Sequence, residues 1–186
     1  MNKALALALI AAAGLSAGCA SSDKSKEAKK RNPAPCPNVV VLDDAARAVE
    51  FDGDQELENI AYSAEILDVK LNCRYFADEP IKAKLDIEMA FGRGPKGSAQ
   101  KRDFVYWVAV TRRNLDVIEK AEFAVPVEFG ERENVRTTRQ EVDEIVIPRA
   151  NADIAGTNFE VVVGLRLTPD QAIFNRSGKS LKFPEL

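Results

Sequence analysis

Histidine, the side chain best suited to acid–base catalysis near neutral pH and the commonest transition-metal ligand, does not occur in this chain of 186 residues. Catalytic triads and zinc sites would have to be built without it. No serine occupies a Gly-x-Ser-x-Gly turn, because Ser98 lies in "KGSAQ". We therefore assign no catalytic, cofactor-binding or metal-binding residue, and we expect a protein that is not an enzyme.

Two further stretches contain residue types that bind ions. The segment "DGDQELE" offers the carboxylates of Asp52, Asp54, Glu56 and Glu58, but it lacks the spacing of a calcium-binding loop and indicates a solvated turn. "GRGPKGS", residues 92–98, has glycines suited to phosphate, yet its last residue stands where a P-loop has lysine, and we expect a hairpin loop. A carboxylate pair that hydrolyses glycosides stays an open alternative, since the chain has 29 acidic residues.

Residues 1–18 have the pattern of an export signal. Lys3 supplies a positive start, and residues 4–15 form an apolar run too short to span a bilayer stably. Small residues at 16–18 then precede Cys19. This stretch resembles the lipobox of bacterial lipoproteins, in which the cysteine is acylated and becomes the new N-terminus. An ordinary secreted protein that is cut nearby is the alternative.

The lipobox resemblance implies a location. Acyl chains such as palmitate on Cys19 would anchor the protein in a membrane, and several chains hold it stably where one does not. Lipoproteins retained in the inner membrane of well-studied Gram-negative bacteria often carry Asp after the cysteine, whereas Ala20 and Ser21 follow it here. The resemblance therefore favours the periplasmic face of the outer membrane.

The remaining cysteines, Cys36 and Cys73, form an even pair once Cys19 carries lipid. In an oxidising periplasm we expect them to form a disulfide. Residues 19–35 comprise the lipidated cysteine and a tether in which basic residues outnumber acidic ones. The tether lacks large apolar side chains and usable periodicity, so we expect it to be a disordered spacer, with attraction to anionic lipid or cell wall as the alternative. Residues 36–186 then form one folded domain.

Strict alternation of apolar and polar side chains predicts that this domain is built from β-strands. In "IKAKLDIEMAF" the apolar residues share one face and the charged residues the other. Seven segments are predicted as strands: residues 39–42, 59–76, 81–91, 103–111, 121–129, 141–148 and 159–167. We expect a bulge where the alternation slips at Ile66 and Leu67, and an edge position or a bulge at Pro126.

Seven strands separated by turn residues predict an all-β, antiparallel sandwich of the immunoglobulin or fibronectin kind, with a small closed barrel as the alternative. The segment 103–111 is apolar on both faces and should be central, with Tyr106 and Trp107 on opposite sides and packed in the core rather than forming a sugar-stacking platform. The cysteine pair should staple one end of the sandwich.

One short C-terminal helix is predicted after the last strand. In "LTPDQAIFNRSG", Thr168 is the N-cap, Pro169 is the first helical residue, and Gln171 completes a capping box. Gly178 can end the helix. We expect residues 173–174 to close one end of the sandwich, and a weaker helical turn to begin near Asp43.

Several stretches of the chain resemble an uncharacterised family of short Gram-negative envelope lipoproteins: the lipobox, "CPNVVVL", "LNCRYF", "GRGP", "YWVAV" and "VVVGLRLTPDQAIFNR". The resemblance covers essentially the whole chain. It implies an envelope lipoprotein, and it implies no activity for any residue here.

These observations predict a lipid-anchored, non-catalytic binding or assembly module of the periplasm, with an envelope protein as partner. The alternative is a protein that binds peptidoglycan or another glycan, or hydrolyses it with carboxylates. A net charge of −3 gives no reason to expect nucleic acid as a partner. Exposure and charge indicate three candidate contact regions: residues 92–102, residues 132–139, and the helix near Arg176.

Overall fold

The structure is a computed structural model that describes residues 35–114 and 116–179. The predicted signal peptide, Cys19 and all of the tether except Pro35 lie outside the described residues. Within the described part, the chain forms eight strands, one α-helix and three short 3₁₀ turns. The strands are β1 (Asn38–Val41), β2 (Arg47–Phe51), β3 (Ile60–Arg74), β4 (Ile81–Arg93), β5 (Lys101–Arg112), β6 (Val117–Glu128), β7 (Val135–Ile147) and β8 (Phe159–Leu165). The helix is α2 (Pro169–Arg176).

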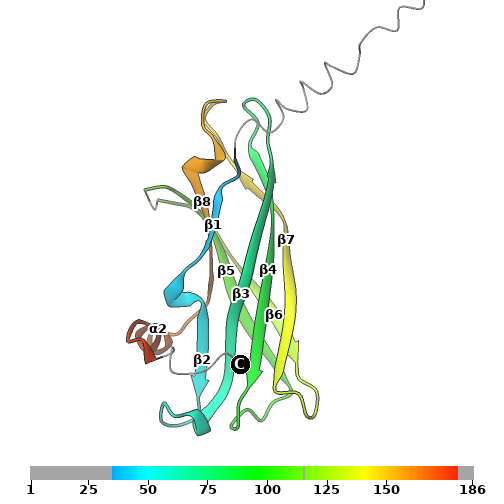
Figure 1. The fold of residues 1–186 in the computed structure, drawn as a ribbon, viewed down its shortest axis with the longest axis vertical. Helices are drawn as coiled ribbons and strands as arrows, with labels where there is room; N and C mark the ends of the chain where they lie inside the picture. The colour runs from blue at the N-terminus through cyan, green and yellow to red at the C-terminus, as the bar shows by residue number, and fades with distance from the viewer. Residues whose placement is uncertain (1–34, 115, 180–186) are drawn as a thin grey trace, which may run out of the picture.

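The strands form two four-stranded sheets that face each other (Figure 1). Sheet A has the order β1-β8-β5-β6 and sheet B the order β2-β3-β4-β7. All neighbours are antiparallel except β1 and β8. The neighbour order of β3 to β8 is that of immunoglobulin strands A, B, C, C′, E and F, and β1 takes the place of strand G, but in parallel orientation. The predicted all-β sandwich is therefore confirmed.

The described residues form eight strands, one more than the seven predicted. The additional strand is β2, whose sequence has no clear alternation of apolar and polar residues. The turn expected near Asp43 is present as a 3₁₀ turn over Asp43–Ala45, and β2 begins directly after it. Only tertiary contacts identify this strand: it pairs with β3, where Arg47 forms an ion pair of 2.7 Å with Glu65.

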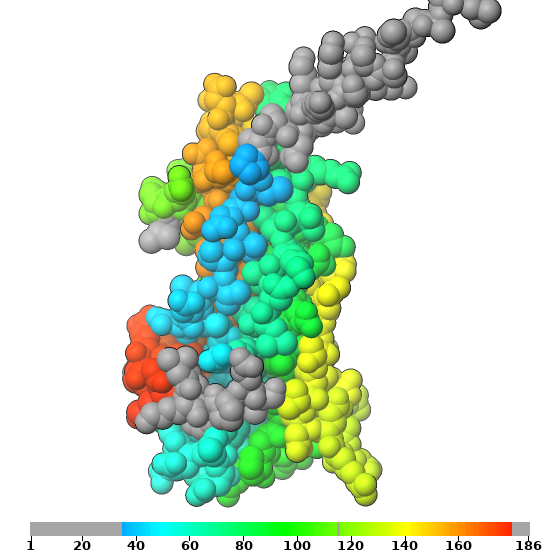
Figure 2. Space-filling model, viewed as in Figure 1, coloured from blue at the N-terminus to red at the C-terminus, as the bar shows by residue number. Residues whose placement is uncertain are grey.

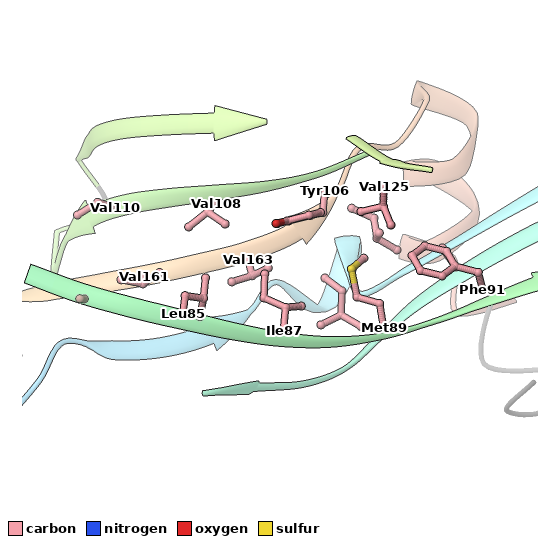
Figure 3. Packing of buried hydrophobic residues seen from close by; sticks show 14 of the residues in the cluster. Leu85, Ile87, Met89, Phe91, Tyr106, Val108, Val110, Val125, Val161 and Val163 are labelled. Atoms are coloured by element: carbon pink, nitrogen blue, oxygen red, sulfur yellow. The ribbon is translucent and has the colours of Figure 1, made fainter. Parts of the chain in front are cut away.

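The core fills the space between the sheets. The predicted alternation in β4 is confirmed, since the side chains of Leu85, Ile87 and Met89 are fully buried and point toward those of β8 and β5 (Figure 3). The central position of β5 between β8 and β6 is also confirmed. Tyr106 and Trp107 do lie on opposite faces of β5: Tyr106 is buried in the core, and Trp107 is half-buried on the outer face.

Both predicted irregularities are confirmed. The pairing of β3 with β4 shifts between Ile66 and Asp68, and Leu67 points outward with half of its surface exposed. Pro126 lies on β6, the edge strand of sheet A. The N–H of Phe129 donates to Gln100 O at 2.8 Å, and counting back along the ladder places the missing N–H of Pro126 on the free edge. Proline is tolerated there because no ladder hydrogen bond is lost.

The predicted disulfide joins Cys36 to Cys73, with Cα atoms 5.6 Å apart. It links the segment that enters sheet A to the end of β3 in sheet B, so it staples one end of the sandwich, as expected. The hydroxyl of Tyr75 strengthens this end, since it donates to Pro35 O at 3.1 Å and accepts from the N–H of Gly156 at 3.2 Å. A Cβ on Gly156 would lie 2.5 Å from Pro35 O, so only glycine fits.

Helix α2 begins and ends where the sequence predicts. Thr168 and Gln171 form the full capping box, and Gly178 follows the helix with a positive φ of 71°. Phe174 is buried against Val49 and Ile60, as expected for a closing residue. The expectation for Ile173 is wrong: its side chain is 66% exposed, because it points away from the sheets.

One loop expectation is also wrong. Residues 94–100 do not form a hairpin loop, because β4 belongs to sheet B and β5 to sheet A, and the segment crosses between them. Gly94 and Gly97 allow this crossing segment to pack on the start of β3, where a Cβ would lie 2.3 Å and 2.5 Å from backbone oxygens. The strand predicted at residues 141–148 begins earlier, at Val135, so residues 135–139 of the candidate contact region are the first residues of β7, and they are exposed or half-buried there.

Candidate functional site

A groove with a volume of about 650 Å³ lies on the side of the sandwich that carries α2. Strands β2 and β3 form one wall, the start of β5 forms the opposite wall, and the segment from Leu165 to Phe174 closes the groove. The groove exists because sheet A is narrower here: β1 has ended at Val41, and the chain leaves β8 after Leu165 to enter α2. Sheet B continues as β2 without a facing strand.

An ion pair crosses the groove from sheet to sheet. The guanidinium of Arg102 on β5 donates to the carboxylate of Glu50 on β2. The same guanidinium lies over the ring of Tyr62, 5.1 Å from its centre. The hydroxyl of Tyr62 in turn accepts from the N–H of Ala99 at 2.8 Å. Both partners of the ion pair are close to half exposed, so water screens the attraction and its main effect is on orientation.

Two acidic residues of the groove lining have no cationic partner within the described residues. Asp103 lies on β5, on the outer face that also carries Trp107 and thus at the rim of the groove, and Asp170 lies in the first turn of α2. Neither carboxylate makes an ion pair or a hydrogen bond within residues 35–114 and 116–179. Glu50 is paired with Arg102, and Arg166, the other arginine of the lining, is paired with Glu122 at 3.4 Å, so among the described residues no cation neutralises Asp103 or Asp170. A cationic group in the groove would be stabilised by both.

Ser63 also belongs to the groove lining, but its hydroxyl oxygen is buried. Ser63 is 4% exposed, and its Oγ has no hydrogen-bond partner in the described part of the chain. A buried hydroxyl without a partner costs about 1 to 3 kcal/mol. Phe51 and Phe104 supply the apolar surface nearby. The groove therefore combines apolar walls with a few polar groups, which is typical of binding sites.

Side chains of α2 hold the groove open at β2. The amide of Gln171 donates to Val49 O at 3.0 Å, and the amide of Asn175 donates to Arg47 O at 2.8 Å. These carbonyls lie along the edge of sheet B, so α2 occupies the position that another strand would take. The ring of Phe174 packs edge-on against Phe51, with ring centres 5.4 Å apart.

A second, smaller hollow of about 240 Å³ lies on the outer face of sheet A. Trp107 forms part of it, with its Nε1 donating to Leu165 O at 3.1 Å and the ammonium of Lys120 4.6 Å from the ring centre. The indole faces are thus partly occupied by Lys120, and Tyr106 is on the other face of the strand. A sugar-stacking platform of Tyr106 and Trp107 is excluded by this geometry, and core packing of Trp107 is also wrong.

Of the residues singled out in the sequence, Thr168, Gln171 and Phe174 line the groove, whereas Arg176 and Glu133 are not part of its lining. Arg176 forms an exposed ion pair of 2.8 Å with Asp44. In the turn before β7, the Gly130 N–H and the Arg136 guanidinium together hold the pKa of Glu133 below its ordinary value. The crossing segment 94–100 contacts the groove lining through Ala99, whose backbone is hydrogen-bonded to the hydroxyl of Tyr62.

The ion pair of the groove had no signal in the sequence. Glu50 and Arg102 are separated by many residues and meet only because β2 and β5 belong to facing sheets. Sequence reasoning did include Arg102, as the last residue of a candidate contact region, but it placed this residue on a loop rather than on a strand.

No family model, no curated protein and no solved structure matches this chain. The groove has therefore to be interpreted from its own geometry and chemistry.

No group of His, Cys, Asp and Glu side chains within residues 35–114 and 116–179 is arranged to hold a metal ion. The helices of these two segments include none that is both long and apolar enough to cross a membrane.

Proposed function

We propose that this protein is a lipid-anchored binding module of the cell envelope, which holds a segment of a partner protein in the groove between β2 and β5. The observation that carries the proposal is the groove itself, whose apolar walls lie beside two carboxylates, Asp103 and Asp170, that have no cationic partner in the described part of the chain. The chemistry of the groove favours a partner segment that presents apolar side chains and a lysine or arginine.

The positions of the groove and of the chain entry suit an anchored module. The chain enters the domain at Cys36, which is bonded to Cys73 at the end of β3, whereas Tyr62 of the groove lies at the start of β3. Strand β3 runs along the long axis of the domain (Figure 1). At about 3.3 Å per residue, these two points on β3 are roughly 35 Å apart. A domain held at the Cys36 end through Cys19 and the tether therefore carries its groove at the far end.

The disulfide and Tyr75 make the entry point rigid. Force on the tether is transmitted to both sheets, since Cys36 leads into sheet A and Cys73 belongs to sheet B. The periplasmic face of the outer membrane is the location we propose for the anchor, on the basis of the lipobox resemblance and of Ala20 and Ser21 after Cys19.

The test is crosslinking in cells from a photoreactive amino acid at Gln55, which lines the groove. We expect one dominant envelope protein to be crosslinked through a segment that contains a basic residue. The variant Asp103→Asn/Asp170→Asn should lower the yield about tenfold, since it removes both unpaired charges. Asp153→Asn, an exposed carboxylate at the opposite end, is the matched control and should leave the yield unchanged.

The outcomes separate this proposal from the alternatives. Crosslinks that are insensitive to the paired substitution would show that the groove does not select for charge, and the proposal would be wrong. Sedimentation of the purified protein with cell wall, abolished by the same substitution, would assign the groove to a glycan instead of a protein.

A further inference from the structure

The two sheets have four edges, and three of them are protected against pairing with another strand. Strand β2 is covered by the side-chain amides of Gln171 and Asn175 on α2. Strand β6 carries Pro126 at a position that faces outward, and β1 pairs over only four residues. Strand β7, 13 residues long, contains no proline, and no element of the described residues covers its free edge (Figure 2, yellow). An edge of this kind is a template for strand addition.

The ladder shows which groups of β7 face outward. The N–H of Arg93 donates to Asn134 O at 2.7 Å, so the adjacent pair Gly92–Val135 is a pair that does not share hydrogen bonds. Hydrogen-bonded and non-hydrogen-bonded pairs alternate along an antiparallel ladder. The backbone N–H and C=O groups of residues 135, 137, 139 and 141 therefore point away from β4.

The charges on β7 are divided between its two halves. Arg136 and Arg139 lie in the first half, and Glu141, Asp143 and Glu144 lie in the second. A strand with this pattern is complementary to a second copy of itself in antiparallel orientation. We propose that two copies of the chain pair through β7, with the two-fold axis passing between their Gln140 residues, to form one continuous sheet from both copies of sheet B.

Among the registers with the two-fold axis at residues 138 to 142, only the one centred on Gln140 places opposite charges opposite each other without pairing like charges. With the axis at Gln140, Arg139 of each copy lies opposite Glu141 of the other, and both residues have outward-facing backbone groups that can exchange two hydrogen bonds. An axis at residue 139 sets Arg139 against itself, and an axis at residue 141 sets Glu141 against itself. An axis at residue 138 pairs no opposite charges, and one at residue 142 sets Glu141 opposite Asp143. Like charges directly opposite are destabilising.

The side chains of the pairing residues also lie on one face. Arg139 and Glu141 are both exposed on the outer face of sheet B, where Lys84 already binds Glu141 at 2.7 Å. The irregular pairing near Asp143 ends the regular stretch, which limits the interface to the middle of β7. A short interface of this kind is weak, and we expect a dissociation constant on the order of 10 μM or above.

The first test is analytical ultracentrifugation of the full chain in detergent. We expect a concentration-dependent monomer–dimer equilibrium. Arg139→Glu should weaken dimerisation about tenfold, because it places the carboxylate of residue 139 in each copy opposite that of Glu141 in the other. Glu141→Arg should weaken dimerisation to the same extent, because it places two guanidinium groups opposite each other at the same two positions. The double variant Arg139→Glu/Glu141→Arg restores opposite charges and should recover the dimer. A chain that stays monomeric up to about 1 mM, or a double variant no better than the single ones, overturns the proposal.

The second test does not depend on charge. At the two-fold axis the Cα atoms of the two Gln140 residues would lie about 4.5 Å apart, within reach of a disulfide. Oxidation of the full-chain Gln140→Cys variant should give a covalent dimer on a non-reducing gel. Thr138→Cys is the matched control on the same face, and its two copies would lie roughly 13 Å apart. Equal yields from both variants, or no dimer from Gln140→Cys, would overturn the register.

Discussion

Replacing both Cys36 and Cys73 with serine removes the covalent link between the two sheets at the end where the tether enters. The disulfide closes a loop with a sequence separation of 37 residues. The loop contains β1, β2 and most of β3, so the link constrains much of both sheets in the unfolded chain. The chain-entropy model assigns a loop of this length about 4 kcal/mol of stabilisation at 25 °C.

The other contacts around the disulfide do not involve its sulfur atoms, so we expect them to remain in the variant and to maintain the fold. Tyr75 still bridges Pro35 and Gly156, and β1 still pairs with β8. We therefore expect the loss of about 4 kcal/mol to appear as a lower free energy of unfolding without a change of fold. Two serine hydroxyls in place of a half-buried disulfide add a small cost of the same sign.

The assay is urea unfolding of a chain that begins at residue 19 and carries Cys19→Ser, followed by the fluorescence of Trp107, the single tryptophan. The Cys36→Ser/Cys73→Ser variant is compared with the same chain under reducing and oxidising conditions. We expect the reduced chain and the double serine variant to agree within about 1 kcal/mol. If the free energy of unfolding falls by less than about 1 kcal/mol in both the reduced chain and the double serine variant, the reasoning is refuted. The loop would then be held together by local contacts in the unfolded chain even without the disulfide.

Three other substitutions test separate parts of the structure. Cys19→Ser should move the protein from the membrane fraction to the soluble fraction in flotation, with its unfolding midpoint unchanged; continued flotation would remove the anchor from the proposal. Burial raises the pKa of Tyr106, so stability should fall as the pH rises past about 10, where the unfolded chain ionises first. Tyr106→Phe should reduce this loss between about pH 8 and pH 11 in urea unfolding, and an unchanged pH profile would contradict the assignment. A Cβ on Gly164 would lie 2.5 Å from Cζ2 of Trp107, so Gly164→Ala should cost about 1 to 3 kcal/mol and shift the tryptophan emission, whereas an unaltered midpoint would argue against this packing.

The parts of the fold that the sequence predicts are those with a strong local pattern. Alternation identified β4 because one face of it is fully buried and the other carries Lys82, Lys84 and other charges. The capping box located α2 because Thr168 and Gln171 satisfy the first backbone groups of the helix on their own. The alternation in β4 and the capping box of α2 each depend on residues close together in the sequence, so both can be recognised without knowing the tertiary structure.

The parts that could not be predicted depend on which strands become neighbours. Strand β2 is short, and its side chains face a groove on one side and α2 on the other, so neither face shows a continuous apolar pattern. The segment 94–100 has the composition of a hairpin loop, and only the pairing of β4 with β7 forces it to cross to the other sheet. The groove could not be predicted for the same reason, because its ion pair joins strands of different sheets and forms only once both sheets are in place.

The groove and the proposed dimer interface lie at opposite edges of sheet B, because β2 and β7 are its two edge strands. A pair of domains joined through β7 would therefore carry its grooves at the outer ends of an eight-stranded sheet, roughly 35 Å apart at the usual strand spacing. Two grooves on one assembly would bind a partner with two segments much more tightly than one groove binds a single segment. It follows that Arg139→Glu should leave the affinity for a single basic segment unchanged and lower only the affinity for a paired one, whereas Asp103→Asn/Asp170→Asn should lower both.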